Sequence, residues 1–166
     1  YKCMNILLTG GSGFIGSHAC LSFIQAGHRV TIYDNLSNSK ENVISRIKKI
    51  TGKNIAFIKG DILNQQMLSK AISDNKIESV IHFAGLKSVS DSIKNPLDYF
   101  DNNVAGTLSV LKAMEQNNIK KIIFSSSATV YGVPEYLPID EDHKLEPINP
   151  YGVGKKIIED MLKDIA

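Results

Sequence analysis

The sequence predicts an α/β fold in which helices cover both faces of one parallel β-sheet. Short apolar runs alternate with amphipathic segments along all 166 residues, and a glycine-rich turn follows the first apolar run. This alternation is typical of parallel sheets whose strands are joined by crossover helices. In such sheets, ligands bind beyond the carboxyl ends of the strands.

The expected elements follow one another in regular order. The predicted strands are the apolar runs at residues 4–8, 29–33, 55–58, 79–84 and 119–124. A helix is predicted at 14–26 with Gly27 as its C-cap, and another of about a dozen residues reaches Thr51 before Gly52. Asn64 is the expected cap of a third helix, Pro96 opens a long fourth one, and the last begins near Tyr151 after a loop at 133–150.

The turn at residues 9–16 reads Thr-Gly-Gly-Ser-Gly-Phe-Ile-Gly and lies between the first predicted strand and the first predicted helix. Gly10, Gly13 and Gly16 have no Cβ, so a pyrophosphate can approach the backbone and the helix N-terminus closely. Asp34 ends the second strand about 20 residues later, where an acid binds a ribose 2′-hydroxyl. These residues predict a Rossmann-type dinucleotide site, and Asp34 would repel a 2′-phosphate, which favours NAD over NADP.

Tyr151 and Lys155 are four residues apart, so a helix would present both side chains on one face. An ammonium lowers the pKa of a neighbouring phenol, which suits proton transfer at a hydroxyl or a carbonyl. Ser127, after the fifth predicted strand, can bond the same oxygen, and Lys155 has a second possible role at the nicotinamide ribose. A plain helix surface is the competing interpretation of the Tyr–Lys spacing.

Composition excludes several other classes. The formal charge of +2 is too close to neutral to indicate nucleic-acid binding, and no apolar run is long enough to cross a membrane. The two cysteines and four histidines show no metal-ligand spacing, so no metal is expected. The length of the chain predicts one domain, and the sequence is best explained by a cytoplasmic location.

The motifs together resemble the extended short-chain dehydrogenase/reductase superfamily and, within it, the UDP-glucose 4-epimerases. The resemblance runs along the whole chain and includes the strings at 9–18, 34–39, 60–62, 80–87, 101–104, 124–132 and 150–152. It implies NAD as cofactor and reversible hydride removal at C4 of a UDP-sugar, through a 4-keto intermediate. The glycine turn and the Tyr–Lys pair mark only the superfamily, whereas the other strings are more specific.

The resemblance also implies residue roles. Tyr151 would take the proton from the sugar 4-hydroxyl, Ser127 would bond that oxygen, and Lys155 would tune Tyr151 and hold NAD. The implied substrate contacts are Lys87, Ser127 and Tyr151. The implied cofactor contacts are Gly10, Gly13, Phe14, Ile15, Gly16, Asp34, Asn35, Leu36, Ser37, Asn38, Ser39, Asp61, Ile62, Phe83, Ala84, Gly85, Leu86, Lys87, Asn102, Tyr151 and Lys155.

Family members are about twice this length, so we expect residues 1–166 to be the NAD-binding portion of an epimerase, truncated before a smaller UDP-sugar-binding domain. This piece alone would turn over sugar poorly. The resemblance further implies a homodimer joined through helices at 97–116 and 151–165; simple core packing is the competing account of their apolar stripes.

Other functions stay open. A nucleotide-sugar reductase, an N-acetylhexosamine epimerase or a non-catalytic NAD-binding module would carry similar cofactor residues. A 4,6-dehydratase is disfavoured because Ala128-Thr129-Val130 offers no acid after Ser127. The choice between plain and N-acetylated sugars is left open by this sequence.

Overall fold

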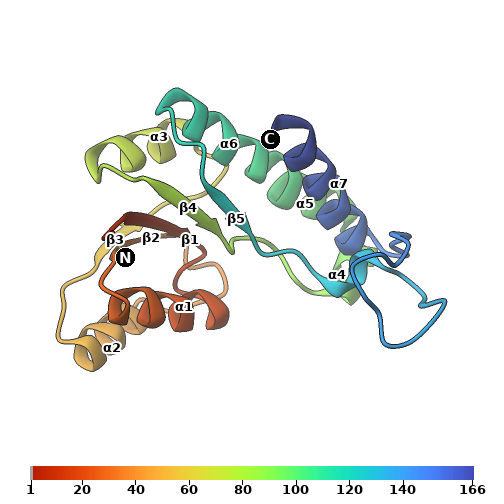
Figure 1. The fold of residues 1–166 in the computed structure, drawn as a ribbon, viewed down its shortest axis with the longest axis horizontal. Coiled ribbons are helices and arrows are strands. Elements are labelled where there is room, and N and C mark those ends of the chain that lie inside the picture. Colours follow the sequence, from red (N-terminus) through yellow and green to blue (C-terminus); the bar gives the residue numbers. More distant parts are fainter. Residues whose placement is uncertain (1) are drawn as a thin grey trace. The chain divides into compact units, whose positions relative to one another are not determined.

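The computed structural model describes residues 2–166, and its strands form one five-stranded parallel sheet (Figure 1). The strands are β1 Asn5–Thr9, β2 Arg29–Asp34, β3 Ala56–Lys59, β4 Ser79–His82 and β5 Ile122–Phe124. Their order is β3-β2-β1-β4-β5, and every neighbouring pair is parallel. The predicted α/β class with a doubly wound parallel sheet is therefore confirmed.

The central strand β1 buries side chains on both faces because side chains alternate along a strand. Leu7 pairs in register with Thr31 of β2 and Val80 of β4, and its side chain is fully buried. Ile6 and Leu8 are also buried but belong to the apolar cluster on the opposite face. An uninterrupted apolar run such as 6–8 is thus what a strand covered on both sides requires.

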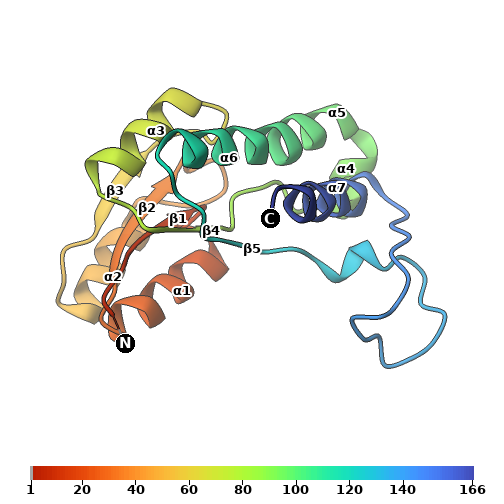
Figure 2. The ribbon, with the colours of Figure 1, turned by 45° about the horizontal axis from the view of Figure 1, so that its top comes forward.

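Helices cover the two faces separately. Figure 2 shows α1 (Phe14–Gln25) and α2 (Asn42–Thr51) on one face of the sheet, with α3 (Gln65–Asp74) and α6 (Gly106–Gln116) on the other. Cys20, Ile24 and Ile47 fill the first cluster, while Leu68 and Val110 belong to the second. The remaining helical elements are α4 Val89–Lys94, α5 Pro96–Tyr99, a π-helical stretch η1 Phe100–Ala105, a 3₁₀ turn η2 Ala128–Val130 and α7 Pro150–Ile165.

The helix ends match most of the expected caps. The Asn64 side chain accepts a hydrogen bond from the Met67 N–H, and Gly52 ends α2 in the left-handed conformation with φ of 68°. The C-cap of α1 is Ala26, one position earlier than the expected Gly27, which follows it with φ of 89°. Gly16, Cys20 and Ile24 form the buried face of α1. This face lies one residue beyond Ile15, Ala19 and Phe23, which the four-residue spacing in the sequence predicts to share a face.

Four elements differ from the expectations. The fourth and fifth strands are shorter than predicted, ending at His82 and beginning at Ile122. Helix α4 was not predicted, although the Ser88 side chain caps it by accepting from the Asp91 N–H. The helix opened by Pro96 is also not uniform, because a π-helical stretch occupies 100–105.

By contact density the chain divides into two compact units, which are described separately below. The sheet unit extends to Ala84 and includes Leu108–Ser125; the helical unit comprises Gly85–Thr107 and Ser126–Ala166. The sheet unit therefore holds the five strands, and the helical unit holds α4, α5, η1, η2 and α7.

Replacing Leu7 with Ala tests the core of the sheet unit. Leu7 is fully buried, so Leu7→Ala should lower the free energy of unfolding by about 2–5 kcal/mol. Ile50→Ala is the control, since Ile50 is 63% exposed and should change stability by about 0.5 kcal/mol or less. Urea denaturation followed by circular dichroism measures both, and equal effects of the two variants would contradict the assignment.

Candidate active site

The glycine turn after β1 has a geometry that only glycine permits at two positions. Gly10 has φ of 66°, and a Cβ there would lie 2.6 Å from the Ala84 nitrogen. A Cβ on Gly16 would lie 2.4 Å from the Gly10 oxygen. The turn therefore runs directly against the backbone after β4, and α1 starts directly against the turn.

The start of α1 offers backbone donors to an anion. Gly13 is the N-cap, and no side chain caps this helix end. The first N–H groups of a helix have no intrahelical partner and carry the positive end of its dipole. Phe14 and Ile15 stand at this end, with 83% and 50% of their areas exposed. The predicted phosphate-binding residues thus share one accessible surface.

Asp34 lies at the end of β2 and connects the glycine turn to the following loop. Its carboxylate accepts hydrogen bonds from the Ser12 N–H at 2.9 Å and the Leu36 N–H at 2.8 Å, and from the Ser39 hydroxyl at 3.4 Å. The residue is 6% exposed. The loop at 34–39, predicted to bind the ribose, therefore folds around the Asp34 carboxylate, on which that prediction was based.

Asp61 lies beside this loop, at the end of β3. Its carboxylate accepts from the Asn35 amide at 2.9 Å, and its backbone oxygen accepts from the Tyr33 hydroxyl at 2.9 Å. The neighbouring Ile62 is 5% exposed, with its side chain in the apolar core. Ile62 can therefore offer a ligand mainly its backbone, whereas Asp61 has polar atoms at the edge of the sheet.

Phe83 and Ala84 follow β4 within the same unit. The Phe83 N–H donates to the Thr9 oxygen at 3.0 Å, and the Ala84 N–H to the Thr9 hydroxyl at 3.5 Å. That hydroxyl also bonds the His82 ring at 2.6 Å. The sheet unit thus brings the predicted residues between Gly10 and Ala84 to the carboxyl edge of its strands.

The helical unit contains the predicted proton-transfer residues. Tyr151 and Lys155 lie in the first turns of α7, which starts at Pro150 with Asn149 as its N-cap. The Lys155 Nζ is 5.9 Å from the centroid of the Tyr151 ring, and the two residues are 4% and 8% exposed, respectively. The predicted pair is therefore a buried contact and not a solvated helix surface.

Burial changes the acidity of the lysine. It lowers the pKa of Lys155 from 10.5 to about 8, with the positive charge of Lys87 adding to the decrease and the charge of Glu159 opposing it. Glu159, one turn further along α7, also accepts a hydrogen bond from the Ser126 hydroxyl. The ammonium of Lys155 therefore titrates in the range where catalytic groups work.

Ser127 lies at the start of the 3₁₀ turn η2, which packs against α7. Its hydroxyl oxygen accepts from the Thr129 N–H at 3.3 Å and from the Thr129 hydroxyl at 3.0 Å. A Cβ on Gly152 would lie 2.7 Å from the Thr129 oxygen, so the turn and the first turn of α7 touch through their backbones. The turn that carries Ser127 and the helix that carries Tyr151 are thus neighbours.

The segment 85–87 is held by an asparagine that the sequence analysis did not select. Asn103 is 3% exposed; its amide oxygen accepts from the Leu86 N–H at 2.8 Å, and its amide nitrogen donates to the Leu86 oxygen at 2.9 Å. The predicted cofactor residue Asn102 is half-buried. Paired asparagines inside a helix were the available signal, but only the π-helical backbone decides which one faces the segment.

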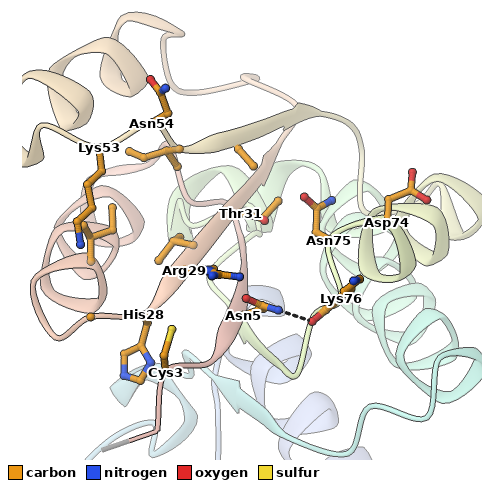
Figure 3. A pocket seen from close by; sticks show the side chains of 15 residues that line it. Cys3, Asn5, His28, Arg29, Thr31, Lys53, Asn54, Asp74, Asn75 and Lys76 are labelled. Carbon is orange, nitrogen blue, oxygen red and sulfur yellow. Dashed lines mark hydrogen bonds between the residues drawn. The ribbon is translucent and has the colours of Figure 1, made fainter.

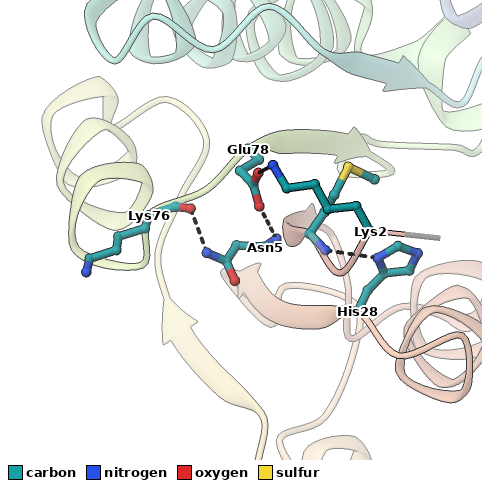
Figure 4. A network of polar contacts seen from close by, with 6 residues as sticks. Lys2, Asn5, His28, Lys76 and Glu78 are labelled. Carbon is teal, nitrogen blue, oxygen red and sulfur yellow. Dashed lines mark hydrogen bonds and ion pairs between the residues drawn. The ribbon is translucent and has the colours of Figure 1, made fainter.

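A pocket of about 560 Å³ lies at the opposite edge of the sheet, where the strands begin (Figure 3). Asn5, Arg29 and Ala56, the first residues of β1, β2 and β3, contribute to its wall. Beside it, Asn5 bonds the Glu78 carboxylate and the Lys76 oxygen, and Lys2 pairs with Glu78 at 3.7 Å (Figure 4). None of the predicted site residues lines this pocket.

Two further properties concern residues 2–166 alone. No cluster of three or more histidine, cysteine or acidic side chains in this part of the chain is arranged to hold a metal ion. Within the same range, no helix combines the length and hydropathy that membrane crossing requires.

Comparison with known proteins gives consistent matches. A family model described as GDP-mannose 4,6 dehydratase matches residues 7–166. UDP-glucose 4-epimerase of Bacillus subtilis (strain 168) is 49% identical over 162 residues, which are 98% of this chain and 48% of that protein. The chain therefore spans about half the length of the curated relatives it matches.

Solved structures agree over nearly the whole chain. UDP-glucose-4-epimerase from Stenotrophomonas maltophila, crystallised with NAD and formylated UDP-arabinopyranose, has a TM-score of 0.96 at 44% identity and covers 98% of this chain and 48% of its own. The Bifidobacterium longum UDP-glucose 4-epimerase, in complex with NAD⁺ and UDP, has a TM-score of 0.95 at 43% identity, covering 97% and 48%.

The buried Lys155 gives a prediction on stability. Since its folded pKa is lowered, the folded state binds fewer protons than the unfolded state between pH 8 and 10.5. The cost, on the order of 3 kcal/mol, is therefore fully present below pH 8 and disappears as the pH rises towards 10.5. Lys155→Met should stabilise the chain at pH 7, and this gain should shrink at pH 10.

Denaturation of both proteins across pH 6–10 measures the effect. Lys156→Met is the matched control, because the Lys156 side chain is more exposed and pairs with Asp160 at 2.7 Å. A pH-independent gain for Lys155→Met, equal to that of the control, would show that Lys155 is not a buried cation.

Proposed function

Because this chain belongs to the family described as GDP-mannose 4,6 dehydratase and its relatives are UDP-glucose 4-epimerases, we propose that it is the NAD-binding portion of such an epimerase. The reaction is the interconversion of UDP-galactose and UDP-glucose, and we attribute it to a protein of the relatives' length that contains these residues. The observation that carries the proposal is the buried Tyr151–Lys155 pair next to the Ser127 turn.

The residues of the sheet unit suit a dinucleotide. Gly10 and Gly16 allow the turn to pack directly against the backbone after β4 and against the start of α1, and the N-terminus of α1 offers free donors to a pyrophosphate. Asp34 and the loop to Ser39 would hold the adenosine ribose, with Asp61 close to the adenine. Phe83 to Lys87, Asn102, Tyr151 and Lys155 would hold the remainder of NAD.

Three residues of the helical unit, Tyr151, Ser127 and Lys155, each have a defined role in the proposed reaction. Tyr151 takes the proton from the 4-hydroxyl of the sugar and later returns it, while the Ser127 hydroxyl bonds the same oxygen. The ammonium of Lys155 favours the phenolate form of the Tyr151 side chain that accepts the proton. When bound, NAD supplies the acceptor and then the donor of the hydride at C4.

Other members of the family would use similar residues for different chemistry. Dehydration needs acidic groups after the serine, whereas here Thr129 follows and bonds the Ser127 hydroxyl. This observation favours epimerisation over 4,6-dehydration. A nucleotide-sugar reductase, an epimerase of N-acetylated sugars and a non-catalytic NAD-binding module are the alternatives that the experiments below distinguish.

We further propose that the protein forms a homodimer through the helices at 97–116 and 151–165. Exposed apolar side chains in the helical unit support this: Leu97 is 79% exposed, Ile157 38% and Ile165 62%. A contact between two copies would remove this apolar surface from water. The cytoplasmic location expected from the sequence stays a prediction.

The cofactor assignment is tested by titrating the chain with NAD and NADP in a calorimeter. NAD should bind more tightly, because Asp34 repels a 2′-phosphate. Asp34→Asn should weaken NAD binding by about 10- to 100-fold and narrow the difference between the cofactors, since a charged acceptor is lost. Glu41→Gln, at the exposed start of α2, is the control; tighter binding of NADP to the unaltered chain would contradict the assignment.

The reaction is tested by replacing Tyr151 with Phe in a protein that contains these residues and has the full length of the relatives. Loss of the phenolic proton acceptor should reduce epimerisation of UDP-galactose by about 10²- to 10⁴-fold while NAD stays bound. Lys156→Gln on the same helix should leave the rate unchanged. Turnover without added NAD separates an epimerase from a dehydrogenase, and an undiminished rate in Tyr151→Phe would refute the proposed role.

A further inference from the structure

The segment that follows β4 is held by two side chains of one helical stretch. Asn103 makes both of its hydrogen bonds to the backbone of Leu86, at 2.8 and 2.9 Å. The Tyr99 hydroxyl accepts from the Ser88 N–H at 3.0 Å. Three hydrogen bonds therefore fix two residues, and Lys87 lies between them.

The chemistry of these two side chains fits the task. A side-chain amide carries one acceptor and donors on adjacent atoms, so Asn103 can satisfy the N–H and the oxygen of a single residue. Asn103 is 3% exposed and Tyr99 is 2% exposed, so both side chains are buried, where losing a hydrogen-bond partner is costly. Tyr99 is the last residue of α5 and Asn103 lies four positions later, within the π-helical stretch from Phe100 to Ala105, and both reach the same segment.

The held segment is connected to the proposed proton-transfer pair. The Tyr99 ring meets the Tyr151 ring edge-on, with centroids 6.5 Å apart. Helix α4, which begins directly after Ser88, packs against α7. The positive charge of Lys87 lowers the pKa of Lys155, and the negative charge of Glu159 raises it.

We propose that Asn103 and Tyr99 are positioning residues that form a clamp on residues 86–88 and thereby fix the ammonium of Lys87 relative to Lys155 and Tyr151. Lys87 itself is exposed, so its location depends on where the backbone is held. The clamp holds the backbone of Lys87, whose positive charge acts on Lys155. Its importance for catalysis rests on the proposed function, but the clamp itself is measurable without any sugar or cofactor.

The test is an NMR titration of the Lys155 side chain in the full chain, carried out on Tyr99→Phe, Asn103→Leu and Lys87→Met. Tyr99→Phe removes only the hydroxyl, and Asn103→Leu keeps a similar shape without the amide. In each variant the pKa of Lys155 should rise from about 8 towards 10.5, but only part of the way, because burial remains its main cause. Asp101→Asn, on the exposed side of η1, should leave the pKa unchanged.

The double variants decide the mechanism. If the clamp acts through Lys87, adding Tyr99→Phe or Asn103→Leu to Lys87→Met produces no further rise. If Tyr99→Phe or Asn103→Leu raises the pKa of Lys155 as much in the Lys87→Met background as in the unaltered chain, the clamp residues only keep Lys155 buried, and the proposal is wrong. An unchanged pKa of Lys155 in the single variants Tyr99→Phe and Asn103→Leu would also overturn the proposal. If Asn103→Leu does not fold, Tyr99→Phe and Lys87→Met complete the same comparison.

The outcome is independent of the proposed function. A rise in the pKa of Lys155 together with failure to bind NAD would support the clamp and reject the cofactor assignment. NAD binding with no rise in any clamp variant would support the assignment and reject the clamp. In an active protein of the relatives' length, Tyr99→Phe should shift the alkaline limb of the pH–rate profile in the same direction as the pKa of Lys155.

Discussion

The sheet unit depends on one close approach between two backbones. The turn after β1 touches the segment after β4 so closely that a Cβ on Gly10 would lie 2.6 Å from the Ala84 nitrogen. This approach requires β1 and β4 to be parallel neighbours that end together, as the register from Ile6–Ser79 to Thr9–His82 shows. The N-terminus of α1 and the ends of three strands consequently meet at one edge. The predicted ligand residues of the glycine turn and of the segment after β4 lie at this edge.

The central feature of the helical unit is a buried cation, and its burial is unfavourable for folding. Lys155 is buried next to Tyr151 with its pKa lowered to about 8, so folding has to hold a cation in a poorly solvated position. Such destabilised groups are common at catalytic sites because the same burial that costs stability adjusts acidity. Asn149 caps the start of α7, while the bond of Glu159 to Ser126 and the backbone contact between Gly152 and Thr129 join α7 to the segment that carries Ser127.

The family match and the local geometry support one another at different levels of detail. The family model is described as a 4,6-dehydratase, whereas the relatives of about 49% identity are 4-epimerases. The difference between these chemistries concerns a few side chains after the serine, which a fold comparison does not resolve. The proposed preference for epimerisation over dehydration therefore rests on Thr129, which bonds the Ser127 hydroxyl, and not on the shared sheet.

The sequence by itself determined the strand–helix alternation, the glycine turn, the acid at the end of β2 and the Tyr–Lys spacing. These features depend on local rules: side-chain periodicity, the lack of a Cβ and the rise of a helix. Strand ends, helix α4 and the one-residue offset of the buried face of α1 were not predictable from periodicity, because tertiary packing sets them. The tertiary structure alone decided that Asn103, and not Asn102, holds Leu86 and that Lys155 is buried. The placement of Asn103 depends on the π-helical stretch, and the burial of Lys155 depends on contacts between residues distant in sequence; no local pattern encodes either.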